Sequence, residues 1–183
     1  MKVWTTLIGL LLATSATAAE PPSLLLYMNP HEYGNEVSIG MKPYFSKWVA
    51  RGAAVEMAAS KVLAAHFRQV GLCEGNKAAD VIAAISPQLN YNPAPGRYYA
   101  RVKVRFYMGN GQWLGSLKAT GQHAAPINSA FTDDDVRQAF EQAMQDIAGQ
   151  YVADATIQEN LHKAMQSDFT RMPCEMVGMI PDK

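Results

Sequence analysis

Apolar and polar residues alternate with a period of two in three successive runs between residues 79 and 122. Breaks that are rich in glycine and proline separate these runs. Such alternation is typical of strands that bury one side and expose the other. The middle run, residues 98–108, has the most regular pattern, and Gly109-Asn110-Gly111 follows it as a tight hairpin turn. The sequence therefore predicts a three-stranded antiparallel meander.

One side of each predicted strand can be assigned to the core. We expect the odd-numbered apolar residues of the first run and the even-numbered ones of the second to pack against helices. In the third run, the side that carries Trp113 is expected to do the same. Pro87 interrupts the first run and indicates an edge position or a bulge at that point.

Two helices are predicted to flank the meander. Apolar residues recur at three- and four-residue steps over residues 46–70, and Gly71 follows as a suitable residue to end a helix. After the meander, Thr132 is placed as an N-cap residue with Asp135 three positions later, which is typical of a helix start. An apolar stripe then extends to Tyr151 and continues beyond it.

A short apolar run at residues 23–28, ended by Asn29-Pro30, predicts one further strand, and residues 31–42 are interpreted as a loop. The predicted order is therefore β-α-β-β-β-α. This order indicates an α+β protein built as a two-layer sandwich. We expect a mostly antiparallel sheet of about four strands, with two long helices on one face.

The N-terminus has the pattern of a secretory signal peptide. Lys2 precedes an apolar run at residues 3–13, and small residues lead to an A-x-A site that ends at Ala18. We predict that residues 1–18 are removed and that residues 19–183 form a single domain with an extended tail from about residue 170. No second long apolar run follows, so no transmembrane segment is predicted in the mature chain. The predicted location is the periplasm, with full secretion as the alternative.

Charge and cysteine content narrow the possible partners. The full chain has 16 Lys+Arg and 16 Asp+Glu, and a balance this close to neutral does not favour nucleic acid as a partner. Cys73 and Cys174 are the only cysteines. Because an exported chain meets an oxidising compartment, we predict a disulfide between them that tethers the tail to the end of the first helix. Two free or metal-binding thiols are the alternative.

A row of cationic and aromatic side chains is the main candidate for a binding surface. Cations beside aromatic rings on a sheet can hold an anionic partner by charge and stacking together. For an exported protein, that partner would be an anionic lipid headgroup, a glycan or an envelope protein. The alternative is an ordinary solvent-facing side of an antiparallel sheet. The row comprises Tyr99, Arg101, Lys103, Arg105 and Tyr107, with Lys118 expected beside it on the next strand.

The tail offers a second candidate, with different chemistry. Thioether and thiolate sulfurs are soft ligands that suit Cu(I), and Met172, Cys174, Met176 and Met179 lie close together in sequence. The alternative is a disulfide-tethered tail whose methionines fill space. A disulfide would consume the only thiolate of the set. We therefore predict no cofactor, and copper handling remains the alternative function.

No catalytic constellation is present in the sequence. It contains no G-x-S-x-G elbow, no phosphate-binding glycine loop and no H-E-x-x-H motif. The histidines are scattered and do not have the spacing of a zinc site. The sequence therefore favours a non-enzymatic protein. A small secreted hydrolase or inhibitor-like factor is a further alternative.

Two short stretches carry a family resemblance. Residues 70–73 read VGLC, and residues 79–82 read ADVI at the start of the meander. This join between helix and strand resembles small envelope accessory proteins of Gram-negative bacteria, of the transport-auxiliary lipoprotein and TolB-N-terminal-like kind. The resemblance spans roughly residues 46–153 and implies a non-enzymatic part in envelope assembly or transport. The chain departs from that pattern because it has no lipidation cysteine near the predicted cleavage site.

Overall fold

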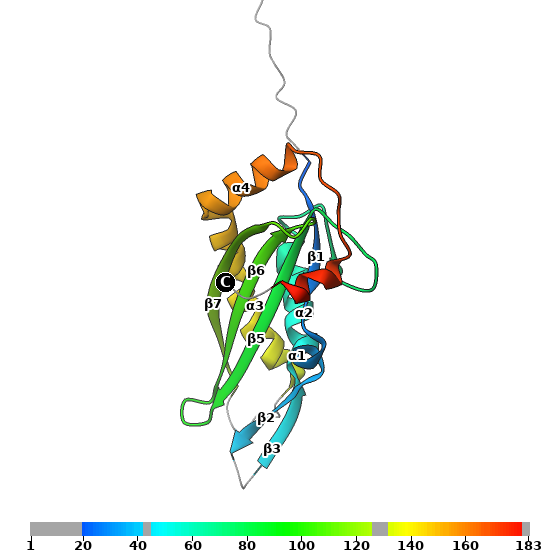
Figure 1. The fold of residues 1–183 in the computed structure, drawn as a ribbon. Coiled ribbons are helices and arrows are strands. Elements are labelled where there is room, and N and C mark those ends of the chain that lie inside the picture. Colours follow the sequence, from blue (N-terminus) through cyan, green and yellow to red (C-terminus); the bar gives the residue numbers. More distant parts are fainter. Residues whose placement is uncertain (1–19, 42–44, 126–131, 181–183) are drawn as a thin grey trace, which may run out of the picture.

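The computed structural model describes residues 20–41, 45–125 and 132–180, and the predicted signal peptide lies outside these residues. The elements are shown in Figure 1. The strands are β1 (Ser23–Tyr27), β2 (Glu36–Met41), β3 (Phe45–Ala50), β4 (Gln69–Leu72), β5 (Val81–Asn92), β6 (Arg97–Met108) and β7 (Trp113–Ala124). The helices are α1 (Pro30–Gly34), α2 (Arg51–Leu63), α3 (Asp133–Ala153), α4 (Ala155–Met165) and the 3-10 helix η1 (Cys174–Met179).

The described strands form a five-stranded sheet in the order β4-β1-β5-β6-β7, and β2 and β3 form a separate hairpin. β5, β6 and β7 are antiparallel, as predicted for the meander, whereas β1 runs parallel to both β4 and β5. The α+β class is confirmed. The sheet is mixed, however, and β4 is a fifth strand that the sequence pattern did not reveal.

The helix predicted over residues 46–70 is wrong at both ends. Only the alanine-rich centre forms a helix, α2. Residues 46–50 belong to β3, residues 64–68 form a turn, and residues 69 and 70 belong to β4. In β3, Val49 is buried and Trp48 has 62% of its surface exposed, which is the alternation of a strand. At the other end, Leu72 pairs with Leu26 of β1. The segment interpreted as a loop, residues 31–42, contributes most of α1 and all of β2.

The main core lies between the sheet and α2 and α3, which cover one face of it (Figure 1). The even-numbered side chains of β6 face these helices, as predicted, and Phe106 is fully buried there. Its ring centroid lies 5.0 Å from that of Tyr151 on α3. α3 begins with the predicted capping box between Thr132 and Asp135. Both the start of α3 and its buried apolar side therefore agree with the prediction.

Trp113 faces away from this core, contrary to the prediction. The register between β6 and β7 shifts at Phe106/Tyr107, so that Tyr107 pairs with Trp113 while Phe106 pairs with Gly115. The extra residue, Leu114, takes the core position and is 1% exposed. An added residue in one strand moves the following side chains to the opposite face. Trp113 consequently packs edge-on against Tyr107, with ring centroids 5.3 Å apart.

The C-terminal segment covers part of the second face of the sheet. η1 lies on the side of β1 and β5 opposite to α2 and α3 (Figure 1). There, buried Cys174 and Val177 pack with Leu25 and Ile82. This segment was expected to be extended, and its short 3-10 helix corrects that expectation. The predicted disulfide between Cys73 and Cys174 is present and fixes η1 to the end of β4.

A buried carboxylate ties the start of the sheet to the tail. Asp80 is 3% exposed and lies directly before β5. One carboxylate oxygen of Asp80 accepts two hydrogen bonds from Ser23: one from the backbone N–H at 2.8 Å and one from the side-chain hydroxyl at 2.7 Å. The guanidinium of Arg171 donates to the other oxygen, with Nε at 3.0 Å. Burial by itself raises the pKa of Asp80, but these hydrogen bonds outweigh it and hold the pKa below its usual value.

The outer edge of the sheet, β7, is bonded to side chains of the helices. Gln150 of α3 donates to the carbonyl of Lys118, and Asn160 of α4 donates to that of Leu114. Gln142 accepts from the N–H of Gln122 at 2.7 Å. α3 can approach this closely because β7 has a glycine, Gly121, where a Cβ atom would lie 2.1 Å from the carbonyl oxygen of Ala139.

Pro87 occupies a position without a strand on its outer side. β1 pairs with β5 only as far as Ala84, so the later residues of β5 have no partner on that side among the described strands. Proline lacks the N–H that a neighbouring strand would need. The predicted edge position is therefore confirmed, although β5 is central at its other end.

Candidate functional site

The predicted basic row lies on the second face of the sheet, opposite to α2 and α3, beside the area that η1 covers. We call this part of β5, β6 and β7 the open face. Arg101 and Lys118 are exposed, whereas Tyr99, Lys103 and Arg105 are half-buried. The alternation of β6 places its members here, because its even-numbered residues are in the core. The structure thus brings five of the six predicted residues to one surface.

Tyr107, the sixth, is not available on this surface. It is 2% exposed and belongs to the small core beneath η1. Tyr107 lies on the same face of β6 as the basic row, as predicted, but the C-terminal segment and Trp113 cover it. The basic row therefore ends at Arg105. Beyond it lies the small apolar core beneath η1, which we call the second core. Tyr99, at the other end, lines a hollow of about 400 Å³ together with Gln88 and Arg101.

The register of β6 and β7 sets cations beside one another. Lys103 and Lys118 are directly opposite each other in the ladder, and Arg101 and Arg105 lie two residues away along β6 on either side of Lys103. Side chains in directly opposite positions have Cβ atoms roughly 4.5–5.5 Å apart, and like charges there are destabilising. Four cationic groups thus converge on a small area. Such an arrangement can hold an anion.

Acidic side chains are absent from the open face of β5, β6 and β7. Opposite the basic row stand neutral residues such as Ser86 and Gln88 of β5 and Thr120 of β7. Among the described residues, Arg101, Lys103 and Lys118 form no salt bridge. A shallow depression of about 600 Å³ lies along these residues and reaches Asp146 and Gln150 of α3 at the sheet edge. The carboxylate in this lining, that of Asp146, belongs to α3 and not to a strand of the sheet.

The proposed copper ligands do not converge as a set of free donors. The sulfur of Cys174 is bonded to Cys73 and is not a thiolate. Met172 packs into the second core, while Met176 and Met179 are 46% and 81% exposed. No cluster of three or more His, Cys, Asp or Glu residues with metal-binding geometry occurs within the described part of the chain.

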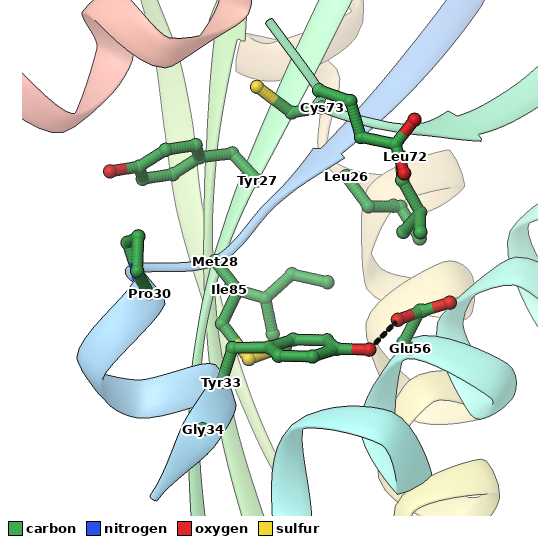
Figure 2. Close-up of a pocket in the computed structure, with 11 residues that line it drawn as sticks. Leu26, Tyr27, Met28, Pro30, Tyr33, Gly34, Glu56, Leu72, Cys73 and Ile85 are labelled. Atoms are coloured by element: carbon green, nitrogen blue, oxygen red, sulfur yellow. Dashed lines mark hydrogen bonds between the residues drawn. The ribbon is translucent and has the colours of Figure 1, made fainter.

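A third pocket lies away from the open face and was not expected from the sequence. It has a volume of about 380 Å³ and is bounded by α1, α2 and the ends of β1 and β4 (Figure 2). Leu26, Met28 and Ile85 form its apolar floor, and Tyr33 extends across it to Glu56. The Tyr33 hydroxyl donates to Glu56 Oε2 at 2.7 Å, and this hydrogen bond raises the pKa of the phenol.

Sequence reasoning missed this pocket because it interpreted residues 31–42 as a loop. One signal was present: Asn29 caps α1 by accepting from the N–H of His31, and Pro30 follows at the first helical position. The juxtaposition of α1 with α2 depends on Gly52, where a Cβ atom would lie 2.3 Å from the carbonyl oxygen of Tyr33. A long-range contact of this kind leaves no periodic pattern.

Among the residues that the structure describes, no helix has both the length and the apolar character needed to cross a membrane.

No protein-family model matches the sequence, and no curated protein does. Solved structures show a distant similarity in fold. Protein XCC0632 from Xanthomonas campestris, of the DUF330 family model, is 15% identical with a TM-score of 0.45, covering 81% of this chain and 92% of its own. A PelC dodecamer from Paraburkholderia phytofirmans is 15% identical with a TM-score of 0.41, covering 69% and 85%. A candidate lipoprotein from Caulobacter crescentus is 14% identical with a TM-score of 0.36, covering 64% and 85%.

At these identities the similarity concerns the fold alone, and no functional residue can be transferred from these proteins. Any function has to be inferred from the residues of this chain.

Proposed function

We propose that this protein is a non-enzymatic accessory protein of the cell envelope that binds an anionic partner through its open face. The observation that carries the proposal is the direct pairing of Lys103 with Lys118 between Arg101 and Arg105, on the open face, whose strands carry no acidic residue. Like charges in directly opposite positions destabilise a pair of strands. An anion bound between them would remove that cost and gain charge-assisted hydrogen bonds.

The geometry favours an extended or flat partner over a small ion. Side chains on one face of a strand recur roughly every 6.6–6.8 Å, so the row from Arg101 to Arg105 presents several charges along a line. The half-buried Lys103 and Arg105 lose little rotamer freedom on binding, because the neighbouring side chains already restrict them. A surface of anionic lipid headgroups is the partner that such a shallow row of charges suits best, and an acidic glycan or envelope protein would be the alternative.

We also propose that the protein acts in the periplasm after cleavage at Ala18, with residues 19–183 as a single domain. The charged and apolar N-terminal pattern supports export. The disulfide between Cys73 and Cys174 supports an oxidising compartment, because such bonds do not persist in the cytosol of most organisms.

The double variant Arg101→Glu/Lys118→Glu is expected to reduce binding to vesicles that contain phosphatidylglycerol by about tenfold or more. Each basic residue near an anionic surface contributes about 1 kcal/mol, and here two are reversed. Both side chains are exposed, so the fold should be retained. The measurement is sedimentation of the mature protein with vesicles of defined composition at two salt concentrations, with vesicles of neutral lipid as the reference.

A matched control is Lys77→Glu/Lys163→Glu, which changes the net charge by the same amount at exposed positions away from the open face. This control should bind nearly as the unmodified protein does. Equal loss in the two double variants would show that only net charge matters and would contradict a site on the open face. An acidic polysaccharide tested in parallel separates a glycan partner from a lipid one.

A further inference from the structure

We propose that the pocket between α1, α2 and β1 binds a small amphiphile that has an apolar chain and an ammonium head. Its volume of about 380 Å³ lies within the roughly 300–1,000 Å³ that is usual for small-molecule sites. The pocket does not overlap with the open face: none of the residues that line it belongs to β6 or β7. The inference is therefore independent of the proposed function.

The interior of the pocket suits a hydrocarbon chain. Leu26 of β1 and Ile85 of β5 are buried, and Met28 and Leu72, which also line the pocket, are half-buried. Figure 2 shows these side chains gathered between the strands and α2. Transfer of a hydrocarbon from water into such surroundings is favourable in proportion to the apolar area that is covered. An unbranched methionine adapts its shape to the chain that it contacts.

The polar end of the pocket is negative. Glu56 lies on α2 and accepts one hydrogen bond from Tyr33, which leaves its second oxygen free of any hydrogen bond within the described part of the protein. It forms no salt bridge with a described residue. A second carboxylate in the lining, Glu74, is paired with Lys77 at 2.7 Å. The net negative charge selects a cationic head and disfavours an anionic amphiphile such as a fatty acid.

Tyr33 adds a further contact for a cation. Its ring reaches from α1 toward Glu56 (Figure 2), and the residue is 41% exposed. The face of a tyrosine ring attracts an ammonium group within about 6 Å. The backbone of Tyr33 is held closely against Gly52 of α2, so this wall of the pocket is already in place before binding. A preformed site loses less conformational entropy when it binds.

The test measures calorimetric binding of three ten-carbon probes to the mature protein, each below its micelle concentration: decylammonium, decanol and decyl sulfate. We expect decylammonium to bind most tightly and decyl sulfate least. Glu56→Gln should weaken decylammonium binding roughly tenfold or more, because a charge-assisted hydrogen bond becomes a neutral one, and should leave decanol unaffected. Tyr33→Phe keeps the carboxylate and should lower decylammonium binding much less than Glu56→Gln does.

Gly34→Phe provides a test of location. Gly34 lines the pocket, and a Cβ atom there would meet nothing within 4 Å, so the ring can fill the opening without a backbone clash. We expect this variant to lose binding of all three probes. Gly149→Phe is the matched control, because Gly149 is exposed on α3 and likewise has open space around it. It should bind as the unmodified protein does.

Three results would overturn the proposal. Decyl sulfate could bind as tightly as decylammonium, Gly34→Phe could bind like Gly149→Phe, or Tyr33→Phe and Glu56→Gln could weaken decylammonium equally. The last result would mean that the hydrogen bond between these residues supports the fold and that Glu56 does not recognise a charge. Should Gly34→Phe fail to fold by circular dichroism, the comparison between Glu56→Gln and Tyr33→Phe decides the matter alone.

Discussion

Replacing Asp80 with alanine is expected to lower the free energy of unfolding by about 3–4 kcal/mol, because it removes an almost fully buried carboxylate that accepts several hydrogen bonds. The N–H and hydroxyl of Ser23 would lose their acceptor at the entry to β1. The guanidinium of Arg171 would lose its partner, although it is half-exposed and can be hydrated. The measurement is urea-induced unfolding of the mature protein near pH 7.

Asp168→Ala is a suitable control, because Asp168 is an exposed carboxylate without a hydrogen bond to a described residue. It should change the free energy of unfolding by less than about 0.5 kcal/mol. Combining Asp80→Ala with Arg171→Ala measures the coupling between the two side chains. The losses should be clearly non-additive, since both substitutions remove the same contact. Strict additivity would mean that the ion pair contributes nothing.

The stabilisation by Asp80 should also depend on pH, with a defined sign. The pKa of Asp80 is lower in the folded protein than its usual value, because the hydrogen bonds outweigh burial. A lowered pKa means that the unfolded chain binds a proton more readily. The contribution is therefore fully present above the usual carboxyl range and is lost as the pH falls through the lower, folded-state pKa. The difference between the unmodified protein and Asp80→Ala should narrow as the pH is lowered below about 4.

Removing the disulfide through Cys73→Ala/Cys174→Ala is expected to lower the free energy of unfolding by about 4 kcal/mol. The two cysteines are 101 residues apart in sequence, and chain-entropy estimates for a loop of about 100 residues reach roughly 4.7 kcal/mol. Alanine is used because Cys174 is fully buried and a serine hydroxyl would lack a partner. Chemical denaturation of the two proteins under the same conditions measures the loss.

Hydrogen exchange can show whether the tail itself is released. Without the disulfide, η1 would still be held by the apolar contacts of Val177 and by the hydrogen bond from the N–H of Gly75 to Glu175. We expect faster exchange of the amide of Cys174, which donates to the carbonyl of Lys77 at 3.0 Å. Val177→Ala with the disulfide intact is the control for packing alone. A loss of less than about 1 kcal/mol in the double variant would contradict an effect on the unfolded chain.

The strands that bury one side were predictable, because apolar and polar residues alternate along them. This is why the even-numbered residues of β6 were assigned correctly to the core. The same rule failed at Trp113, since one extra residue in β7 reverses the assignment and alternation alone does not reveal where a bulge occurs. The helical period misled at β4 as well, because Val70 fell by chance at a helical step from the alanine-rich helix and the first residues of the strand were counted as helix.

The candidate surface was predictable in part for the same reason. A tight turn sets the register of a hairpin, so Lys118 could be placed near the basic row, although its direct pairing with Lys103 could not. Tyr107 was misassigned because it is covered by Trp113, which the bulge turns to this face, and by the C-terminal segment, which is far away in sequence. The pocket beside Glu56 and the bond from Arg171 to Asp80 are long-range contacts as well.

The amide side chains along β7 limit how this protein could join with other chains. A free edge strand is a template on which another polypeptide can add as a further strand, in normal recognition or in aggregation. Here Gln142, Gln150 and Asn160 already occupy backbone groups of that edge. Strand addition at β7 would first have to displace α3 and α4. An assembly that contains this protein should therefore be joined through side-chain surfaces and not through a continuous sheet across that edge.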